Sequence, residues 1–229
     1  MKLIAHRGAS AFEGENTLRS VKRAFKLGAD MVEVDVRQSR DGELVVIHDS
    51  TVDRTTNGKG LVKEKTLKQL KELDAGNGEK IPTLREVLQI LEGKVPADEI
   101  GLVIEIKEPG IEKQVLDILR LEEKVKKVIV ASFYHNVSLN LKSTEKNIKT
   151  GVIFSSQPVR PEIQALDAKA DFMFPFYQYL NEEMVSRAHN HGIEVYPGVI
   201  DSSKDLEFIL SMDVDGFVTN NLIGRKSIK

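Results

Sequence analysis

The sequence predicts an α/β fold of the (β/α)₈ type, the TIM barrel. Short runs rich in β-branched residues alternate with segments of helical periodicity almost from end to end, which is the pattern of parallel βαβ units. Eight such strands in 229 residues come close to the roughly 250 residues of a typical barrel. Barrel strands are buried on both faces, so this fold also explains their nearly continuous apolar sequences. A doubly wound open sheet is the alternative.

The predicted elements cover most of the chain. We expect the barrel strands at Lys2–His6, Met31–Gln38, Leu102–Lys107, Val128–Phe133, Gly151–Ser155, Asp171–Phe176, Ile193–Gly198 and Gly216–Asn220. The helices are predicted at Leu18–Leu27, Leu84–Leu91, Ile111–Leu121, Val137–Lys146, Glu162–Lys169, Glu182–His191 and Asp205–Met212. Thr17, Thr83, Asn181 and Ser203 stand where helices start, so their side-chain oxygens can accept hydrogen bonds from free backbone N–H groups.

One further strand breaks this alternation and predicts a β-hairpin. Leu44–His48 follows the second barrel strand after only a few residues, too few for a parallel crossover. Asp41-Gly42 between them is a favoured two-residue type I′ turn. The register of that turn puts Asp35 opposite His48, with both side chains on one face. The fold is therefore expected to carry an extra hairpin strand after the second barrel strand.

Residues 49–82 form a polar segment, rich in glycine and lysine, before the helix predicted at Leu84–Leu91. Thr66–Leu73 within this segment is predicted to be a short helix. Insertions of this kind lie over the C-terminal mouth of a barrel, where ligands bind. We therefore expect a single domain over residues 1–229, with residues 49–82 as a small inserted cap subdomain.

Charge and composition argue against several classes of partner. The 33 basic and 35 acidic residues give a net charge of −2 and are mixed along the chain, so no patch for nucleic acid is evident. The chain has no cysteine, which excludes disulfides, thiolate nucleophiles and zinc–thiolate sites. No signal peptide is visible and no apolar run approaches about 20 residues, so we expect a cytoplasmic location without integral membrane association. The oligomeric state stays open.

Alternation along the first three barrel strands brings charged and titratable residues to common faces. Glu33 and Asp35 share one face of the second strand, Glu105 and Lys107 share one face of the third, and His6 ends the first. All of them lie near the C-terminal ends of their strands, where barrel enzymes place their active sites. A structural salt-bridge network is the alternative for any one of them. Their convergence on one end of the barrel favours a functional site.

The charges of this cluster favour a cation. Glu33, Asp35 and Glu105 bring −3 while Arg7 and Lys107 bring +2, so the cluster stands at −1 with neutral histidines and would repel an anion. One divalent cation changes the sum to +1, which suits a phosphodiester. Carboxylates are hard oxygen ligands, so Mg²⁺, Ca²⁺ or Mn²⁺ is expected rather than zinc. Bound there, the cation would act as a Lewis acid on a phosphoryl oxygen.

Two histidines are expected to flank the same point from neighbouring strands. His6 ends the first strand, and His48 ends the hairpin strand. Histidine can both accept and donate a proton near neutral pH, so one of the two can serve as base and the other as acid. Which of them is the base stays open. A hydrogen-bonded structural histidine is the alternative for either one alone.

Six short motifs occur in order along the chain. They are His-Arg-Gly at 6–8, Glu-Asn-Thr at 15–17, Glu-Val-Asp at 33–35, Asp-Gly at 41–42, His-Asp at 48–49 and Glu-Ile-Lys at 105–107. With them the chain resembles the glycerophosphodiester phosphodiesterase family over essentially its full length. The resemblance implies hydrolysis of a small-molecule glycerophosphodiester to glycerol 3-phosphate and an alcohol. In family terms, the adjacent glycerol hydroxyl attacks phosphorus and water then opens the cyclic phosphate.

The resemblance also implies a role for each site residue. Metal ligation falls to Glu33, Asp35 and Glu105, acid–base catalysis to His6 and His48, and contacts with the substrate phosphate to Arg7 and Lys107. One departure concerns the substrate wall: relatives commonly have Trp-Thr-Val-Asn where this chain has Gly-Val-Ile-Asp at 198–201, and it contains no tryptophan. Candidates for an apolar wall in its place, or for ordinary packing, are Phe12, Phe133, Phe176 and Tyr177.

Two other functions are alternatives. A lysophospholipase D-like activity on lipids with one acyl chain would require an apolar groove around the inserted segment. A metal-dependent phosphodiester-binding protein without turnover would not need the two histidines, and both are present.

Overall fold

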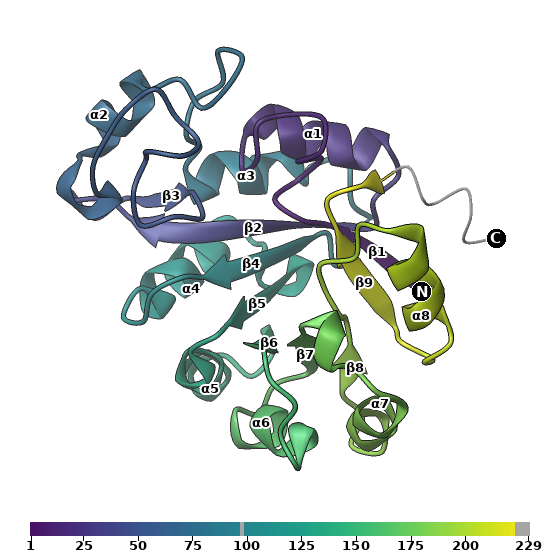
Figure 1. Ribbon diagram of the computed structural model, residues 1–229. Coiled ribbons are helices and arrows are strands. Elements are labelled where there is room, and N and C mark those ends of the chain that lie inside the picture. Colours follow the sequence, from purple (N-terminus) through teal and green to yellow (C-terminus); the bar gives the residue numbers. More distant parts are fainter. Residues whose placement is uncertain (97–98, 223–229) are drawn as a thin grey trace.

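Eight parallel strands follow one another around a nearly closed barrel in the computed structural model, which describes residues 1–96 and 99–222 (Figure 1). Residues 97–98 and 223–229 of the predicted domain lie outside the described residues. The barrel strands are β1 Lys2–Ala5, β2 Met31–Gln38, β4 Leu102–Ile106, β5 Val128–Ser132, β6 Lys149–Phe154, β7 Phe172–Pro175, β8 Glu194–Val195 and β9 Gly216–Thr219. Their order is β8-β7-β6-β5-β4-β2-β1-β9. The predicted (β/α)₈ fold is confirmed.

The two ends of this strand order meet through backbone hydrogen bonds. The amide of Asp215 donates to the carbonyl of Val195 at 3.2 Å, and the amide of Val218 donates to the carbonyl of Pro197 at 2.9 Å. The amide of Ile200 in turn donates to the carbonyl of Val218 at 2.8 Å. The segment after the short strand β8 thus continues the barrel wall beside β9.

Helices alternate with the barrel strands and lie outside them (Figure 1). They are α1 Leu18–Lys26, α3 Leu84–Ile90, α4 Glu112–Leu121, α5 His135–Thr144, α6 Pro161–Asp167, α7 Glu182–His189 and α8 Ser203–Leu210. Short 3₁₀ turns within the described residues include η1 Val62–Glu64, η2 Val125–Lys127 and η3 Tyr177–Tyr179. None of the helices within residues 1–96 and 99–222 is long and apolar enough to cross a membrane.

Most of the predicted helix caps are present. Thr17 accepts a hydrogen bond from the amide of Ser20, and Thr83 and Asn181 cap α3 and α7 in the same way. The prediction for α8 is wrong by one residue, because Ser202 and not Ser203 is the cap. Ser202 stands three residues before Asp205, so its hydroxyl donates to the carboxylate of Asp205 at 2.6 Å and accepts from the amide of Asp205 at 3.1 Å.

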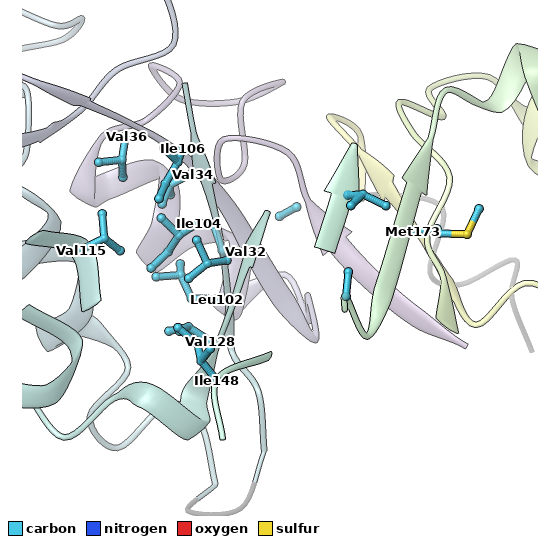
Figure 2. Close-up of a cluster of buried hydrophobic side chains, with 14 of the residues drawn as sticks. Val32, Val34, Val36, Leu102, Ile104, Ile106, Val115, Val128, Ile148 and Met173 are labelled. Atoms are coloured by element: carbon cyan, nitrogen blue, oxygen red, sulfur yellow. The ribbon is translucent and has the colours of Figure 1, made fainter. Parts of the chain in front are cut away.

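The strands bury one face against the helices and the other inside the barrel. Figure 2 shows the outer layer, where Val36 and Ile106 lie near Val115 of α4. The inner layer is a separate apolar cluster made of residues near the starts and middles of the strands: Ile4, Met31, Val103, Ile129, Ala131, Phe172, Phe174, Tyr196 and Val218. Polar residues follow on the same inner face toward the C-terminal ends of the strands. The barrel interior is therefore apolar toward the N-terminal ends of the strands and charged toward their C-terminal ends.

The extra hairpin strand β3 Leu44–Val46 pairs antiparallel with β2, as predicted, but in a different register. Val36 pairs with Val46, so Asp35 does not stand opposite His48. The loop holds three residues instead of two, since the amide of Ser39 donates to the carbonyl of Glu43 at 2.9 Å. Gly42 ends this loop with φ 86°, the left-handed conformation that a three-residue hairpin loop requires there.

Residues 49–82 lie beyond the end of β2 (Figure 1), and they share a small hydrophobic cluster with the hairpin. The predicted helix is present as α2 Leu67–Glu72, and Thr66 and Gln69 form a reciprocal capping box at its start. The cluster joins side chains of this segment to the hairpin and consists of Val45, Ile47, Val52, Val62, Leu70, Ala75 and Ile81. The segment is therefore anchored on β3 by apolar packing.

Candidate active site

The turn after β1 begins the site. Arg7 has φ 55° and Gly8 has φ 82°, so the chain reverses through two successive left-handed residues. A Cβ atom on Gly8 would lie 2.0 Å from Oγ of Ser20, which leaves room for glycine only. This turn directs the amide of Arg7 to Oε2 of Glu33 at 2.9 Å. The His-Arg-Gly sequence thus shapes the backbone around the first carboxylate.

Three buried carboxylates converge from β2 and β4. Parallel pairing sets Asp35 beside Glu105, and Glu33 stands two residues earlier on the same face of β2. One carboxylate oxygen from each of the three lies within 4.8 Å of those of the other two. Exposure of these residues is only 6% for Glu33, 0% for Asp35 and 8% for Glu105. This proximity agrees with the expectation from strand alternation.

Two cations partly neutralise these carboxylates. Nε of Arg7 lies 3.3 Å from Oδ2 of Asp35, and Nζ of Lys107 lies 3.3 Å from Oδ1 of Asp35 and 2.6 Å from Oε1 of Glu105. Burial by itself would lower the pKa of Arg7 and of Lys107, but the neighbouring carboxylates, Asp35 first, raise both pKa values above their ordinary range. Both side chains therefore stay charged.

The donors nevertheless leave some carboxylate oxygens unsatisfied. Oε1 of Glu33 and Oδ1 of Asp35 are buried and accept no hydrogen bond from the residues that the structure describes. Burial, together with the charges of Asp35 and Glu105, raises the pKa of Glu33 well above its usual range. Burial also raises the pKa of Glu105, although Lys107 opposes this shift. Oδ1 of Asp35 still has its ion pair with Lys107, whereas Oε1 of Glu33 has no such contact within the described residues. A buried carboxylate oxygen in this position is costly unless a cation binds it, so this trio fits an oxygen-ligated metal ion.

His6 is held by a neutral amide. Its Nδ1 lies 2.8 Å from Oδ1 of Asn220, and the Nδ2 group of Asn220 donates to Asp201 at 2.7 Å. Oδ1 of Asn220 is therefore an acceptor, so Nδ1 of His6 carries the proton and Nε2 is free to accept one. That Nε2 atom lies 3.9 Å from Oε2 of Glu33. Burial and the charge of Arg7 lower the pKa of His6.

His48 is held by a carboxylate. Its Nδ1 lies 2.6 Å from Oδ1 of Asp49, which can only accept, so Nδ1 of His48 carries the proton. Burial lowers the pKa of His48, and the hydrogen bond to Asp49 opposes that shift. Although the predicted pairing with Asp35 is wrong, the chain bends after β3 and brings His48 into the same pocket as His6.

One pocket at the C-terminal end of the barrel collects six of the seven predicted site residues. They are His6, Arg7, Glu33, His48, Glu105 and Lys107, whereas Asp35 is completely buried and contacts Arg7 and Lys107. The pocket also has an apolar part. Phe133 and Phe176 line it with an edge-to-face ring contact of 6.2 Å between centroids. Phe12 and Tyr177, the other two wall candidates, pack against the outer hydrophobic core.

Sequence reasoning assigned no role to several residues that hold the site. Asn16 donates from Nδ2 to Oδ2 of Asp35 at 2.7 Å, and Asp49 and Asn220 fix the two histidines. Glu15 accepts from Nη1 of Arg7 at 2.8 Å. Glu15, Asn16 and Asp49 belong to the six short motifs, so their motif membership was the available signal. No pattern in the sequence pointed to the pairing of Asn220 with His6.

Glu15 gives a prediction about stability and pH. Burial would raise its pKa, but hydrogen bonds and charge from Arg54 and Arg7 lower the pKa from 4.5 to about 2. A carboxyl group with a depressed folded-state pKa stabilises the fold above its unfolded pKa, and this stabilisation is lost as pH falls toward the folded value. The Glu15→Gln variant should be less stable than the wild type at pH 7 by on the order of 1–2 kcal/mol, since solvent screens the half-exposed Arg54.

Urea unfolding of both proteins at pH 7 and pH 3 measures this difference. We expect it to shrink by about half or more at pH 3, because that pH lies between the unfolded and folded pKa values. An equal difference at the two pH values would contradict the role of the Glu15 charge.

Relatives and solved structures resemble the chain over nearly its whole length. A glycerophosphodiester phosphodiesterase of Caldanaerobacter subterraneus subsp. tengcongensis is 38% identical over 231 residues, covering 96% of this chain and 93% of the relative. One from Bacillus subtilis is 31% identical and covers 95% and 82% of the two chains. A phosphodiesterase of Oleispira antarctica, solved with its product sn-glycerol-3-phosphate, has a TM-score of 0.88, 26% identity and coverage of 99% and 96%.

These likenesses, with the barrel and its charged mouth, define the class of the protein as phosphoric diester hydrolases. The sequence model of the glycerophosphoryl diester phosphodiesterase family matches residues 6–223. The chain belongs to this family and is an enzyme of its kind.

Proposed function

We propose that this enzyme hydrolyses glycerophosphodiesters to glycerol 3-phosphate and an alcohol, with one divalent cation held by Glu33, Asp35 and Glu105. The observation that carries the metal requirement is the convergence of these buried carboxylates, of which Oε1 of Glu33 and Oδ1 of Asp35 lack a hydrogen-bond donor within residues 1–96 and 99–222. A likeness to a phosphodiesterase solved with sn-glycerol-3-phosphate supports the product. The atoms that these three residues offer to a metal are all carboxylate oxygens, which favours Mg²⁺, Ca²⁺ or Mn²⁺.

In this proposal the substrate phosphate binds in the pocket beside the metal site and contacts Arg7 and Lys107. A bound divalent ion supplies Lewis-acid polarisation of a phosphoryl oxygen. Arg7 and Lys107 both line the pocket and keep their charge, so each can donate to a phosphate oxygen. Their ion pairs with Asp35 and Glu105 hold the two side chains ready for that contact.

Proton transfer falls to the two histidines. Each donates Nδ1–H to a neighbouring side-chain oxygen, so the neutral ring keeps its Nε2 lone pair for a proton. One histidine, in its neutral form, takes the proton of the adjacent glycerol hydroxyl on Nε2 as that oxygen attacks phosphorus. The other histidine starts as the imidazolium, protonated at Nε2 as well, and gives that proton to the leaving alcohol oxygen. Water then opens the cyclic phosphate with these roles reversed.

We treat residues 49–82 as a cap subdomain of a single domain. Its separate apolar cluster and its place beyond β2 support this assignment. Through Asp49 and Arg54 the segment touches groups next to the pocket.

Release of glycerol 3-phosphate from glycerophosphocholine tests the proposal. We expect product release with added Mg²⁺, Mn²⁺ or Ca²⁺, and loss of at least about 99% of it after complete chelation, since the metal supplies several kcal/mol of transition-state stabilisation. Readdition of the cation should restore the rate. Turnover that survives metal removal would refute the metal assignment. Tight binding of glycerophosphocholine without turnover would instead favour a non-catalytic phosphodiester-binding protein.

The apolar wall favours one second candidate, a lysophospholipase D-like activity. Phe133 and Phe176 are 43% and 39% exposed and line the same pocket as the charged groups. An acyl chain leaving the pocket would cover them. A lysophosphatidylcholine with a long acyl chain, assayed beside glycerophosphocholine, separates the two activities: a higher kcat/KM for the lipid would make it the main substrate.

A further inference from the structure

Arg54, near the start of residues 49–82, binds two carboxylates at once. Its Nε and Nη2 atoms lie 2.8 and 2.9 Å from the two oxygens of Asp49. Its Nη1 and Nη2 atoms lie 2.7 and 2.8 Å from the two oxygens of Glu15. A guanidinium that offers paired N–H groups to two carboxylates fixes both their positions and their planes.

Each of these carboxylates in turn holds a predicted site residue. Oδ1 of Asp49 lies 2.6 Å from Nδ1 of His48. Oε1 of Glu15 lies 2.8 Å from Nη1 of Arg7, whose Nε lies 3.3 Å from the buried Asp35. The guanidinium of Arg54 is therefore linked through Asp49 to the acid–base candidate His48, and through Glu15 to the phosphate-binding candidate Arg7.

We propose that Arg54 is a positioning residue that sets the orientation of His48 and of Arg7 through Asp49 and Glu15. The inference rests on the function proposed above. Arg54 does not line the pocket, so it acts through its two carboxylates and touches no reacting group. By binding both carboxylates it also offsets part of their negative charge while Asp49 orients the imidazole.

A second arginine provides a matched control. Arg19 of α1 lies 3.0 Å from Glu79 and donates to the carbonyl of Asn77 at 3.2 Å, so it also ties the barrel to residues 49–82. Its side chain is 44% exposed and that of Arg54 is 47% exposed. In the described part of the chain these bonds lead away from the histidines and from Glu15 and Asp49, and Arg19 does not line the pocket. If Arg54 only tied residues 49–82 to the barrel, replacing Arg54 and replacing Arg19 would have equal effects on kcat.

The experiment compares Arg54→Lys and Arg54→Ala with Arg19→Lys and Arg19→Ala. Lysine keeps the charge but cannot bind two carboxylates in paired fashion. We expect Arg54→Lys to lower kcat about tenfold and Arg54→Ala about a hundredfold, the scale of a misplaced reacting group. KM should rise a few-fold through Arg7. Neither Arg19 variant should change kcat by more than about twofold. Mn²⁺ affinity should stay within about twofold in all four, since the trio is untouched.

Nitrogen NMR of isotope-labelled histidine supplies a readout that does not depend on activity. In the wild type the proton of neutral His48 should reside on Nδ1, and in Arg54→Ala the ring should become a mixture of both tautomers. Thermal unfolding of each variant shows whether it is folded, and the lysine variant covers the case in which the alanine variant is not.

Wild-type kcat and an unchanged His48 tautomer in the folded Arg54 variants would overturn the inference. Equal losses in the Arg19 and Arg54 variants would overturn it as well. If instead His48→Ala retained full turnover, the proposed acid–base role of His48 would fail, and the tautomer measurement would still decide whether Arg54 orients the ring.

Discussion

Replacement of His48 by alanine should lower turnover at least about a hundredfold, the usual scale for loss of an acid–base group. The ring lines the pocket, and its Nδ1–H bond to Asp49 leaves Nε2 for proton transfer. Metal affinity should stay nearly intact, because His48 is not one of the three clustered carboxylates. Steady-state release of glycerol 3-phosphate and calorimetric titration with Mn²⁺ measure the two quantities in the same preparation.

His135 is the matched control for this variant. It begins α5, and its Nε2 bonds to the carbonyl of Ile153 at 3.0 Å. Ile153 lines the active-site pocket, but His135 does not. The His135→Ala variant should keep turnover within about threefold of the wild type, as expected for a group outside the reaction. Wild-type turnover in His48→Ala would remove this histidine from the mechanism.

Replacement of Glu105 by glutamine should weaken binding of the divalent cation at least about tenfold, because even supporting groups around a metal contribute that much. The change removes the charge of one of the three proposed ligands, and it leaves Lys107 without the carboxylate 2.6 Å from its Nζ. Turnover at a fixed, subsaturating metal concentration should fall at least in proportion. Titration calorimetry with Mg²⁺, Mn²⁺ and Ca²⁺ gives the affinities directly.

Glu108 is the control for the Glu105 variant. It lies just after β4, where it accepts from the amide of Gln38 at 2.9 Å, and it does not belong to the carboxylate cluster. The Glu108→Gln variant should bind the cation as the wild type does. Unchanged affinity in Glu105→Gln would contradict the ligand assignment, whatever its effect on turnover.

Strand periodicity was sufficient to predict most of the fold. Met31–Gln38 is a strand with the predicted bounds, because β-branched residues alternate there without a glycine or proline. Prediction was poorest at Ile193–Gly198, where only Glu194–Val195 is a strand. Pro197 has no amide hydrogen to donate, and its carbonyl bonds instead to β9. Strand ends depend on such long-range partners, which a periodic pattern does not contain.

The hairpin register and the cap of α8 were predicted wrongly because the local sequence suits two structures in each place. Asp41-Gly42 suits a two-residue turn, but Gly42 also suits the last position of the three-residue loop that is present. A single residue of loop length shifts the register, and with it the partner of Asp35. At α8, Ser202 and Ser203 can both cap a helix, and the reciprocal bond with Asp205 decides in favour of Ser202.

The clustering of the carboxylates could be predicted because alternation and parallel pairing fix which side chains share a face. Their proximity depends only on the parallel register of two neighbouring strands, which carry Glu33, Asp35 and Glu105. The groups that orient the histidines could not be found in this way. His6 and Asn220 are 214 positions apart, and their contact exists only because β1 and β9 are neighbours in the barrel. Arg54 reaches Glu15 from a loop, to which no periodicity applies.

In the part of the chain that the structure describes, the apolar cluster inside the barrel closes the active-site pocket on the side of the strand N-termini, so reactants enter and leave at the C-terminal end of the barrel. The cluster that fills the interior beneath the carboxylates includes Ile4, Met31, Phe172 and Tyr196. Substrate, water and products therefore pass through the pocket opening beside Phe133 and Phe176. In the proposed two-step reaction, the departing alcohol and the incoming water use the same passage. The alcohol must therefore vacate it before hydrolysis of the cyclic phosphate begins, and a slow-leaving alcohol would delay the second step without changing its chemistry.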